Sequence, residues 1–278
     1  GTVDNIDSIW AAGSFCKGFV PSTGGNQQQK CAAGGGTWSR RANPQVGYSP
    51  TQEFSRDTWS LSHEGKWELG NSFVSLSYVD TQNHGRTLPF TASERELLLA
   101  MFDGTGVYSG ISEEERKDLA EATFLPRAKR VMASNQYTLD AKLDMPFEMA
   151  GQHKAVFGTQ VIRGELEDGV FGMESGAPGG VQEHNMWSVF AEDTWDATQA
   201  FAITAGLRRD DHEVFGSEVS PRLYGVYTLT EQWTVKGGVS TGYKTPKTTQ
   251  LYDGVVGFGG QGTSPQFGNP DLKPETST

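Results

Sequence analysis

Apolar and polar side chains alternate strictly along Tyr137-Thr138-Leu139-Asp140-Ala141-Lys142-Leu143-Asp144-Met145. A period of two residues predicts a β-strand with one apolar face and one polar face. The same alternation recurs at 201–210 and 233–244, and in each case the polar face carries charges. These segments predict an all-β protein. Alternation alone fits both a soluble sandwich and a membrane barrel with a wet lumen.

The spacing of the predicted strands separates these two architectures. Strands are expected at about 56–64, 72–83, 134–147, 153–167, 185–196, 200–213, 219–229 and 233–244. Their connections alternate between short turns and mostly long loops, which is typical of outer-membrane barrels with turns inside and loops outside. Aromatic residues at strand ends fit the interfacial girdles of such barrels; they are Trp59, Trp187, Trp195, Trp233 and Tyr243. The sequence therefore predicts eight antiparallel strands of a transmembrane β-barrel with long extracellular loops.

The orientation of the strands follows from the same alternation. Lipid is expected to contact the apolar set, which is Tyr137, Leu139, Leu143, Ile203, Leu207, Val235 and Val239. The lumen is expected to contact the charged set, which is Asp140, Lys142, Asp144, Arg208, Lys236 and Lys244.

Composition limits the function classes. Only 36% of the 278 residues are hydrophobic, and the sequence has no apolar run of about 20 residues that could form a spanning helix. The net charge of −11 argues against a nucleic-acid partner held by phosphate contacts. Composition leaves a soluble β-rich binding or adhesion module, for example for carbohydrate, as the alternative to a barrel.

The two cysteines, Cys16 and Cys31, lie in a polar segment without metal-ligand spacing, so a disulfide is expected there. Two capping boxes, which begin at Ser93 and Ser112, predict short helices at 94–102 and 113–122 in the longest loop. The segment between them fails the ligand pattern of a calcium loop, which favours a capped helical hairpin.

The last forty residues carry a more specific signal. Val239-Ser240-Thr241-Gly242-Tyr243-Lys244-Thr245-Pro246 is followed by Gly268-Asn269-Pro270-Asp271-Leu272-Lys273-Pro274-Glu275-Thr276. This pair of motifs resembles the TonB-dependent outer-membrane receptors. Within that family, the receptors for catecholate-type ferric siderophores are most similar to Lys244-Thr245-Pro246-Lys247 with Leu251-Tyr252-Asp253-Gly254 and Gly257-Phe258-Gly259-Gly260-Gln261-Gly262. The resemblance implies a barrel of about 22 strands with an N-terminal plug. It also implies a Gram-negative outer-membrane location and import of a ferric siderophore with energy from the TonB complex.

On this resemblance the chain is expected to be the middle of a receptor barrel. Residues 1–55 would form an extracellular loop with the disulfide, 56–244 the strands and 245–278 another extracellular loop. The plug and the segment that contacts TonB would lie outside the chain. Lipid and lipopolysaccharide of the outer membrane are the other expected partners.

The candidate ligand contacts are cations and aromatic rings near the loops, because a ferric catecholate is anionic and carries flat rings. They are Arg40, Arg41, Arg86, Arg127, Arg130, Lys244, Lys247, Tyr252 and Phe258. Alternatively, these residues anchor loops or contact lipopolysaccharide phosphates. The five histidines are scattered and no phosphate-binding glycine loop precedes a helix, so neither catalytic residues, nor a metal site, nor a cofactor is expected.

Overall fold

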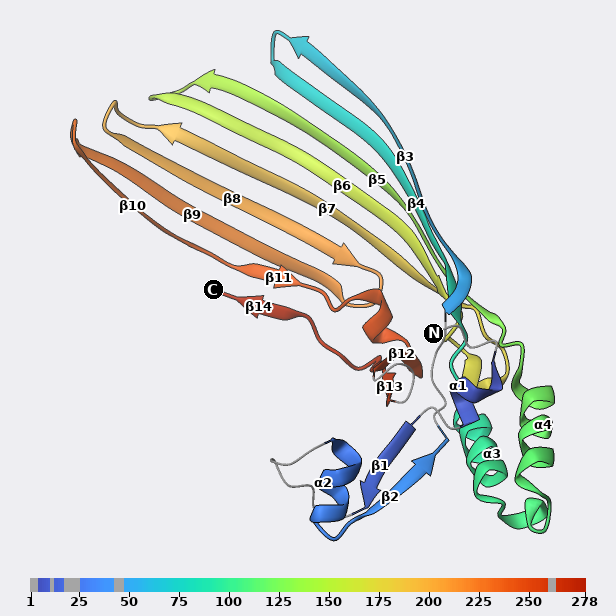
Figure 1. Cartoon of the computed structure of the whole chain (residues 1–278). Coiled ribbons are helices and arrows are strands. Elements are labelled where there is room, and N and C mark those ends of the chain that lie inside the picture. Colours follow the sequence, from blue (N-terminus) through green and yellow to red (C-terminus); the bar gives the residue numbers. More distant parts are fainter. Residues whose placement is uncertain (1–4, 11–12, 18–25, 43–47, 260–263) are drawn as a thin grey trace.

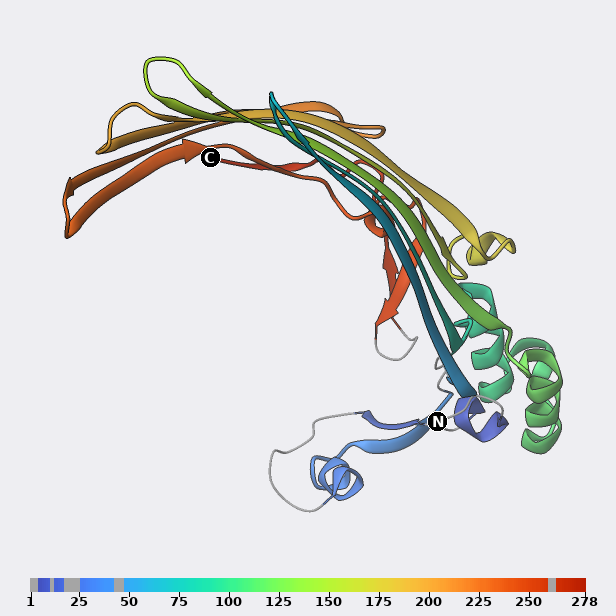
Figure 2. The ribbon, with the colours of Figure 1, turned by 90° about the horizontal axis from the view of Figure 1, so that it is seen from above.

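The chain forms one long, curved β-sheet, and most of its small helical and β elements lie at one end of this sheet (Figure 1). We describe it from a computed structural model that covers residues 5–10, 13–17, 26–42, 48–259 and 264–278. Seen from above, the sheet is bent into an arc (Figure 2). An arc of tilted antiparallel strands is the shape expected of part of a barrel wall.

Eight consecutive strands make up the sheet, and each pairs antiparallel with its neighbours in the sequence. They are β3 (Tyr48–Trp67), β4 (Gly70–Thr87), β5 (Lys129–Glu148), β6 (Gln152–Asp168), β7 (Gly180–Asp196), β8 (Phe201–His212), β9 (Gly216–Thr230) and β10 (Trp233–Ser240). The predicted strands and their order are confirmed. The sandwich alternative is wrong, since all eight strands belong to one sheet rather than to two facing sheets.

Several strands extend beyond the predicted limits at the long-loop end. For example, β3 begins at Tyr48 and β7 at Gly180, whereas the alternation begins at 56 and 185. At this end both faces of the strands carry polar residues, so the period of two is lost although the backbone ladder continues.

The register places the two faces of the strands as alternation predicts. Leu61, Leu76, Leu139, Val161 and Trp187 follow one another as neighbours across five strands. Most large side chains of this apolar face are exposed, including Leu61 at 72%, and a transmembrane barrel would present this face to lipid. The opposite, polar face would line the lumen.

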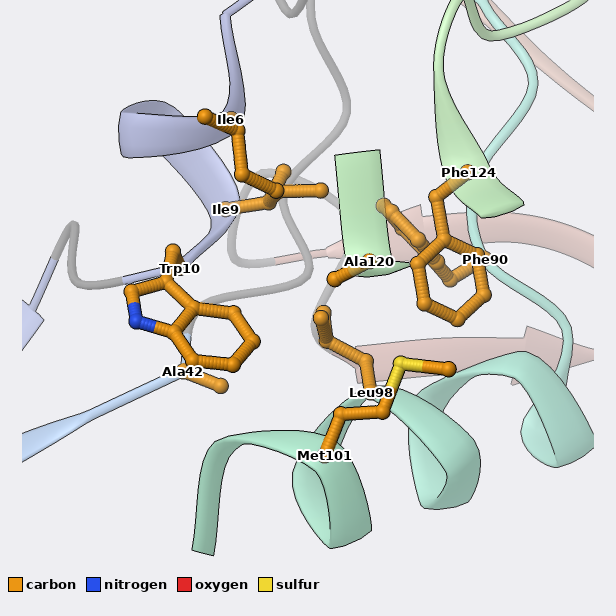
Figure 3. Packing of buried hydrophobic residues seen from close by; sticks show 9 residues of the cluster. All are labelled: Ile6, Ile9, Trp10, Ala42, Phe90, Leu98, Met101, Ala120 and Phe124. Carbon is orange, nitrogen blue, oxygen red and sulfur yellow. The ribbon is translucent and has the colours of Figure 1, made fainter. Parts of the chain in front are cut away.

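The elements at the long-loop end pack around a small hydrophobic core. Helices α3 (Ala92–Asp103) and α4 (Glu113–Phe124) form the expected hairpin, joined by the 3-10 turn η1 (Gly106–Tyr108). Helix α1 (Ile6–Trp10) lies against them (Figure 3). The loop core consists of Ile6, Ile9, Trp10, Ala42, Phe90, Leu98, Met101, Ala120 and Phe124.

One helix start differs from the prediction. The N-cap of α3 is Thr91, whose side chain accepts a hydrogen bond from the Glu94 backbone N–H, and not Ser93. Both residues precede a glutamate at the capping-box spacing, but Thr91 follows Phe90, which is fully buried in the loop core. Packing of Phe90 thus fixes where the chain turns into the helix. The second predicted box, at Ser112 and Glu115, is confirmed.

A separate hairpin carries the disulfide. Strand β1 (Gly13–Lys17) pairs with β2 (Thr37–Arg41), and helix α2 (Gln27–Ala33) lies between them in the sequence. Cys16 and Cys31 are bonded, as predicted, on the long-loop side.

The end of the chain returns to the sheet region through short elements. These are β11 (Gly242–Lys244), the 3-10 turn η3 (Thr248–Leu251), β12 (Val255–Gly259), β13 (Ser264–Phe267) and β14 (Glu275–Ser277). β11 pairs with β14, and β12 with β13. Within the ranges given above, no helix is both long and apolar enough to cross a membrane.

Candidate ligand-binding site

Arg127 anchors the helical loop. Its guanidinium lies 2.8 Å from a Glu94 carboxylate oxygen, donates to the Pro89 carbonyl at 2.6 Å and stacks 4.2 Å from the centre of the Phe90 ring. Burial alone would raise the pKa of Glu94, but hydrogen bonds from Arg127 and Thr91 outweigh burial and lower it. Arg127 therefore holds the start of α3 against the top of the sheet.

Arg130 is likewise engaged with a carboxylate. Its Nε and one terminal nitrogen donate to the two Asp168 oxygens at 2.7 and 2.6 Å, and the side chains are only 8% and 5% exposed. The Asp168 carboxylate also accepts the Val170 backbone N–H at 3.1 Å. This pair joins the ends of β5 and β6 where the loop at 169–179 begins.

The two predicted aromatic contacts pack in a second cluster around η2 (Met173–Ser175). Tyr252 stacks on Phe171 with ring centres 4.4 Å apart, and Phe258 packs against the same buried group. The Arg95 guanidinium of α3 lies 5.7 Å from the centre of the Phe258 ring. These contacts tie the loop at 245–278 to the loop at 169–179 and to α3.

The other predicted cations are distributed around the loop end. Lys244 and Lys247 are exposed, and Lys244 lies 3.6 Å from Glu275 in an open ion pair. Arg86 is exposed near the end of β4. Arg40 and Arg41 belong to β2, but their side chains lie outside the described part of the structure.

A hollow of about 320 Å³ opens on the polar face below the loops. It crosses β3 to β7 and reaches η3, and its lining is Arg56, Val79, Ser134, Asn135, Gln136, Gly164, Glu165, Leu166, His184 and Thr248. Thr248 directly follows Lys247, which places that predicted lysine beside the rim. No residue of the hollow was among the sequence candidates, because polar residues that line a lumen give the same alternation whether or not they meet a ligand.

Most cations of the surrounding polar face already have acidic partners. Arg208 pairs with Asp210 at 2.9 Å, Arg222 with Glu192 at 3.2 Å and Lys142 with Asp144 at 3.1 Å. Arg56 differs, since it is exposed and no carboxylate of the described residues lies within ion-pair distance. Its positive charge is therefore available to a ligand.

No group of three or more histidine, cysteine or acidic side chains suited to a metal ion occurs within the described ranges. The arrangement at the loop end thus combines structural ion pairs, a hydrogen-bonding hollow and exposed lysines, which is the chemistry of a binding surface.

Comparison with known proteins places this geometry in a family. The family model "TonB dependent receptor-like, beta-barrel" matches residues 13–278. The iron-regulated outer membrane virulence protein of Vibrio cholerae serotype O1 is 40% identical over 159 residues, which is 56% of the chain and 24% of that protein. The ferric enterobactin receptor of Pseudomonas aeruginosa is 26% identical over 246 residues, which is 82% of the chain and 30% of that receptor.

Solved structures agree with the sequence relatives. The siderophore receptor PirA from Acinetobacter baumannii superposes with a TM-score of 0.58 at 26% identity, over 81% of the chain and 31% of that receptor. The chain thus spans about a quarter to a third of the length of these relatives. The family is one of outer-membrane receptors rather than enzymes. This chain belongs to the TonB-dependent receptor-like β-barrel family, and its eight-stranded sheet is part of the barrel wall.

Proposed function

We propose that the chain is part of an outer-membrane receptor that imports a ferric siderophore, of the catecholate type, with energy supplied through TonB. The similarity to the ferric enterobactin receptor of Pseudomonas aeruginosa over 82% of the chain carries this proposal. The siderophore is transported cargo, and the proposal requires no chemical step on it.

The loop end has the charge that an anionic ferric chelate needs. Lys244 and Lys247 follow the top of the sheet, and Lys247 is next to the hollow through Thr248. In water the Lys244–Glu275 contact is weak, because both side chains are more than three-quarters exposed at 77% and 80%. A chelate anion can therefore compete with Glu275 for Lys244.

The test is reversal of both lysine charges, Lys244→Glu with Lys247→Glu, in the full-length receptor. A unit charge pair at 4 Å contributes about 4 kcal/mol at an effective dielectric near 20, before screening by salt. A tenfold loss of affinity needs only about 1.4 kcal/mol. We therefore expect the affinity for ferric enterobactin to fall at least about tenfold.

The matched control is Lys66→Glu with Lys154→Glu, which changes the net charge equally at the turn end of the same sheet. Lys154 also pairs with an acid, Asp196, at 2.9 Å, as Lys244 does with Glu275. The control should bind as the unmodified receptor does. Equal affinities of the two double variants would show that Lys244 and Lys247 do not contact the ligand. If the unmodified receptor bound no ferric chelate, the proposed function would be refuted.

A further inference from the structure

We propose that the hollow around Arg56 and His184 is a subsite that binds anionic oxygen atoms at the periphery of the transported chelate. This inference rests on the proposed function and adds to it a place on the barrel wall below the loops. The hollow lies on the polar face, where the register aligns Gln136 with Gly164 and Gly164 with His184.

Hydrogen bonding fixes His184 as a donor. The Val214 backbone N–H points at His212 Nδ1 at 3.1 Å, so this nitrogen carries a lone pair. The proton of neutral His212 is then on Nε2, which lies 3.3 Å from His184 Nδ1 and donates to it. Consequently the proton of neutral His184 is on its own Nε2. His212 is 2% exposed, and its burial favours the neutral form that this chain of hydrogen bonds requires.

Among the other lining residues, hydrogen-bond donors outnumber acidic side chains. Arg56 offers a guanidinium without a carboxylate partner among the described residues, and Gln136 and Thr248 offer an amide and a hydroxyl. Glu165 is the acidic residue of the lining, and its carboxylate accepts a hydrogen bond from Asn135 at 3.1 Å. Arg56 on β3 and His184 on β7 stand at opposite edges of the lining, with β4, β5 and β6 between them. The guanidinium at one edge and the imidazole donor at the other each suit a carboxylate or phenolate oxygen.

The size of the hollow limits what it can hold. Small-molecule sites span roughly 300 to 1,000 Å³, so 320 Å³ is at the lower end of that range. One ring or acid arm of a siderophore fits this volume, whereas the iron centre with all its arms does not. The structure therefore assigns the hollow to a peripheral arm while the loops contact the remainder.

The experiment compares single variants of the full-length receptor with ferric enterobactin as the probe, by fluorescence quenching in detergent. Arg56→Gln should weaken binding about tenfold, and His184→Ala about threefold or more. His212→Ala, which removes the donor to His184 without lining the hollow, should give a smaller loss in the same direction.

The matched control is Arg209→Gln. Arg209 is an exposed arginine of the same sheet, but it lies on the apolar face, opposite to the hollow. There it pairs with Val189 across the strands, and its guanidinium lies 6.0 Å from the centre of the Trp187 ring. Its variant should keep the affinity within about twofold. Heat-modifiable mobility on electrophoresis verifies that each barrel is folded, and Arg56→Gln is chosen because its exposed side chain contributes no core packing.

The outcomes separate the two proposals. In one outcome the unmodified receptor binds the ferric chelate, and the folded Arg56→Gln and His184→Ala variants bind it with the same affinity as the unmodified receptor does. In that case the subsite is refuted and the proposed function stands. If Arg209→Gln weakens binding as much as Arg56→Gln does, the effect is one of total charge, and the subsite is again refuted. If the unmodified receptor binds no ferric chelate, both proposals fail together.

Discussion

The buried pair of Arg130 and Asp168 allows a quantitative test of whether a cation near the ligand entrance anchors a loop or binds the ligand. Replacing Arg130 by Met keeps the side-chain volume but leaves the Asp168 carboxylate without its two short hydrogen bonds at 2.7 and 2.6 Å. Removal of one member of a buried pair costs about 3–5 kcal/mol, because the remaining charge is uncompensated. We expect Arg130→Met to destabilise the loop end by about this amount.

Replacing both members should restore part of the stability. In the double variant Arg130→Met with Asp168→Leu no buried charge remains, and such exchanges are often neutral. The Val170 N–H loses its acceptor, a contact of 3.1 Å, which costs about 1–3 kcal/mol. The double variant should therefore be more stable than Arg130→Met alone.

The free energy of unfolding of the full-length receptor in bilayers, followed by urea titration, measures the overall cost. Hydrogen exchange of the β5 and β6 amides shows whether the effect is local to the loop at 169–179. A single variant within about 1 kcal/mol of the unmodified protein would contradict a desolvated ion pair. Loss of siderophore affinity in a stable double variant would instead show that Arg130 contacts the ligand.

Three further results are expected. Leu139→Arg should destabilise the barrel in bilayers by about 2–4 kcal/mol near the midplane, and normal stability of this variant would contradict the lipid-facing assignment. Because the pKa of Glu94 is lowered in the fold, its contribution to docking of α3 is complete above the ordinary value of 4.5 and is lost as pH falls through the lowered pKa. Tryptophan fluorescence should record this acid step, and Glu94→Gln should abolish it. Replacing Cys16 and Cys31 by Ser should destabilise their hairpin by roughly 3 kcal/mol, measured by its rate of proteolysis, and an unchanged rate would exclude this role.

The strands could be predicted from the sequence because a membrane wall imposes one repeated rule on every strand. Leu139 and Asp140 must lie on opposite faces wherever the strand is placed, so their alternation survives without knowledge of the neighbours. The capping boxes are also local, and the competition between Thr91 and Ser93 was decided by the distant packing of Phe90. Local rules therefore gave the elements and left their exact ends to tertiary contacts.

The roles of individual cations could not be predicted in the same way. Arg130 and Asp168 are 38 residues apart, and only the pairing of β5 with β6 brings them together. Arg127 and Glu94 are 33 residues apart and meet through the helical hairpin. A sequence shows a cation near a loop, but it does not show which acid neutralises it. Arg56 was missed for another reason, because it lies in a strand whose sequence does not distinguish it from other lumen-facing residues.

The contacts between loops connect the proposed subsite to the outer surface. Thr248 lines the hollow, and the same segment continues to Tyr252, which stacks on Phe171. The loop that contains Phe171 also supplies Glu174, whose carboxylate accepts the Ala92 backbone N–H at 3.0 Å at the start of α3. Because α3 shares the loop core with α1 and α4, the segment beside the hollow is joined by direct contacts to the helical layer. A ligand arm in the hollow would therefore meet a segment that is packed, through Tyr252 and Phe171, onto the loop end.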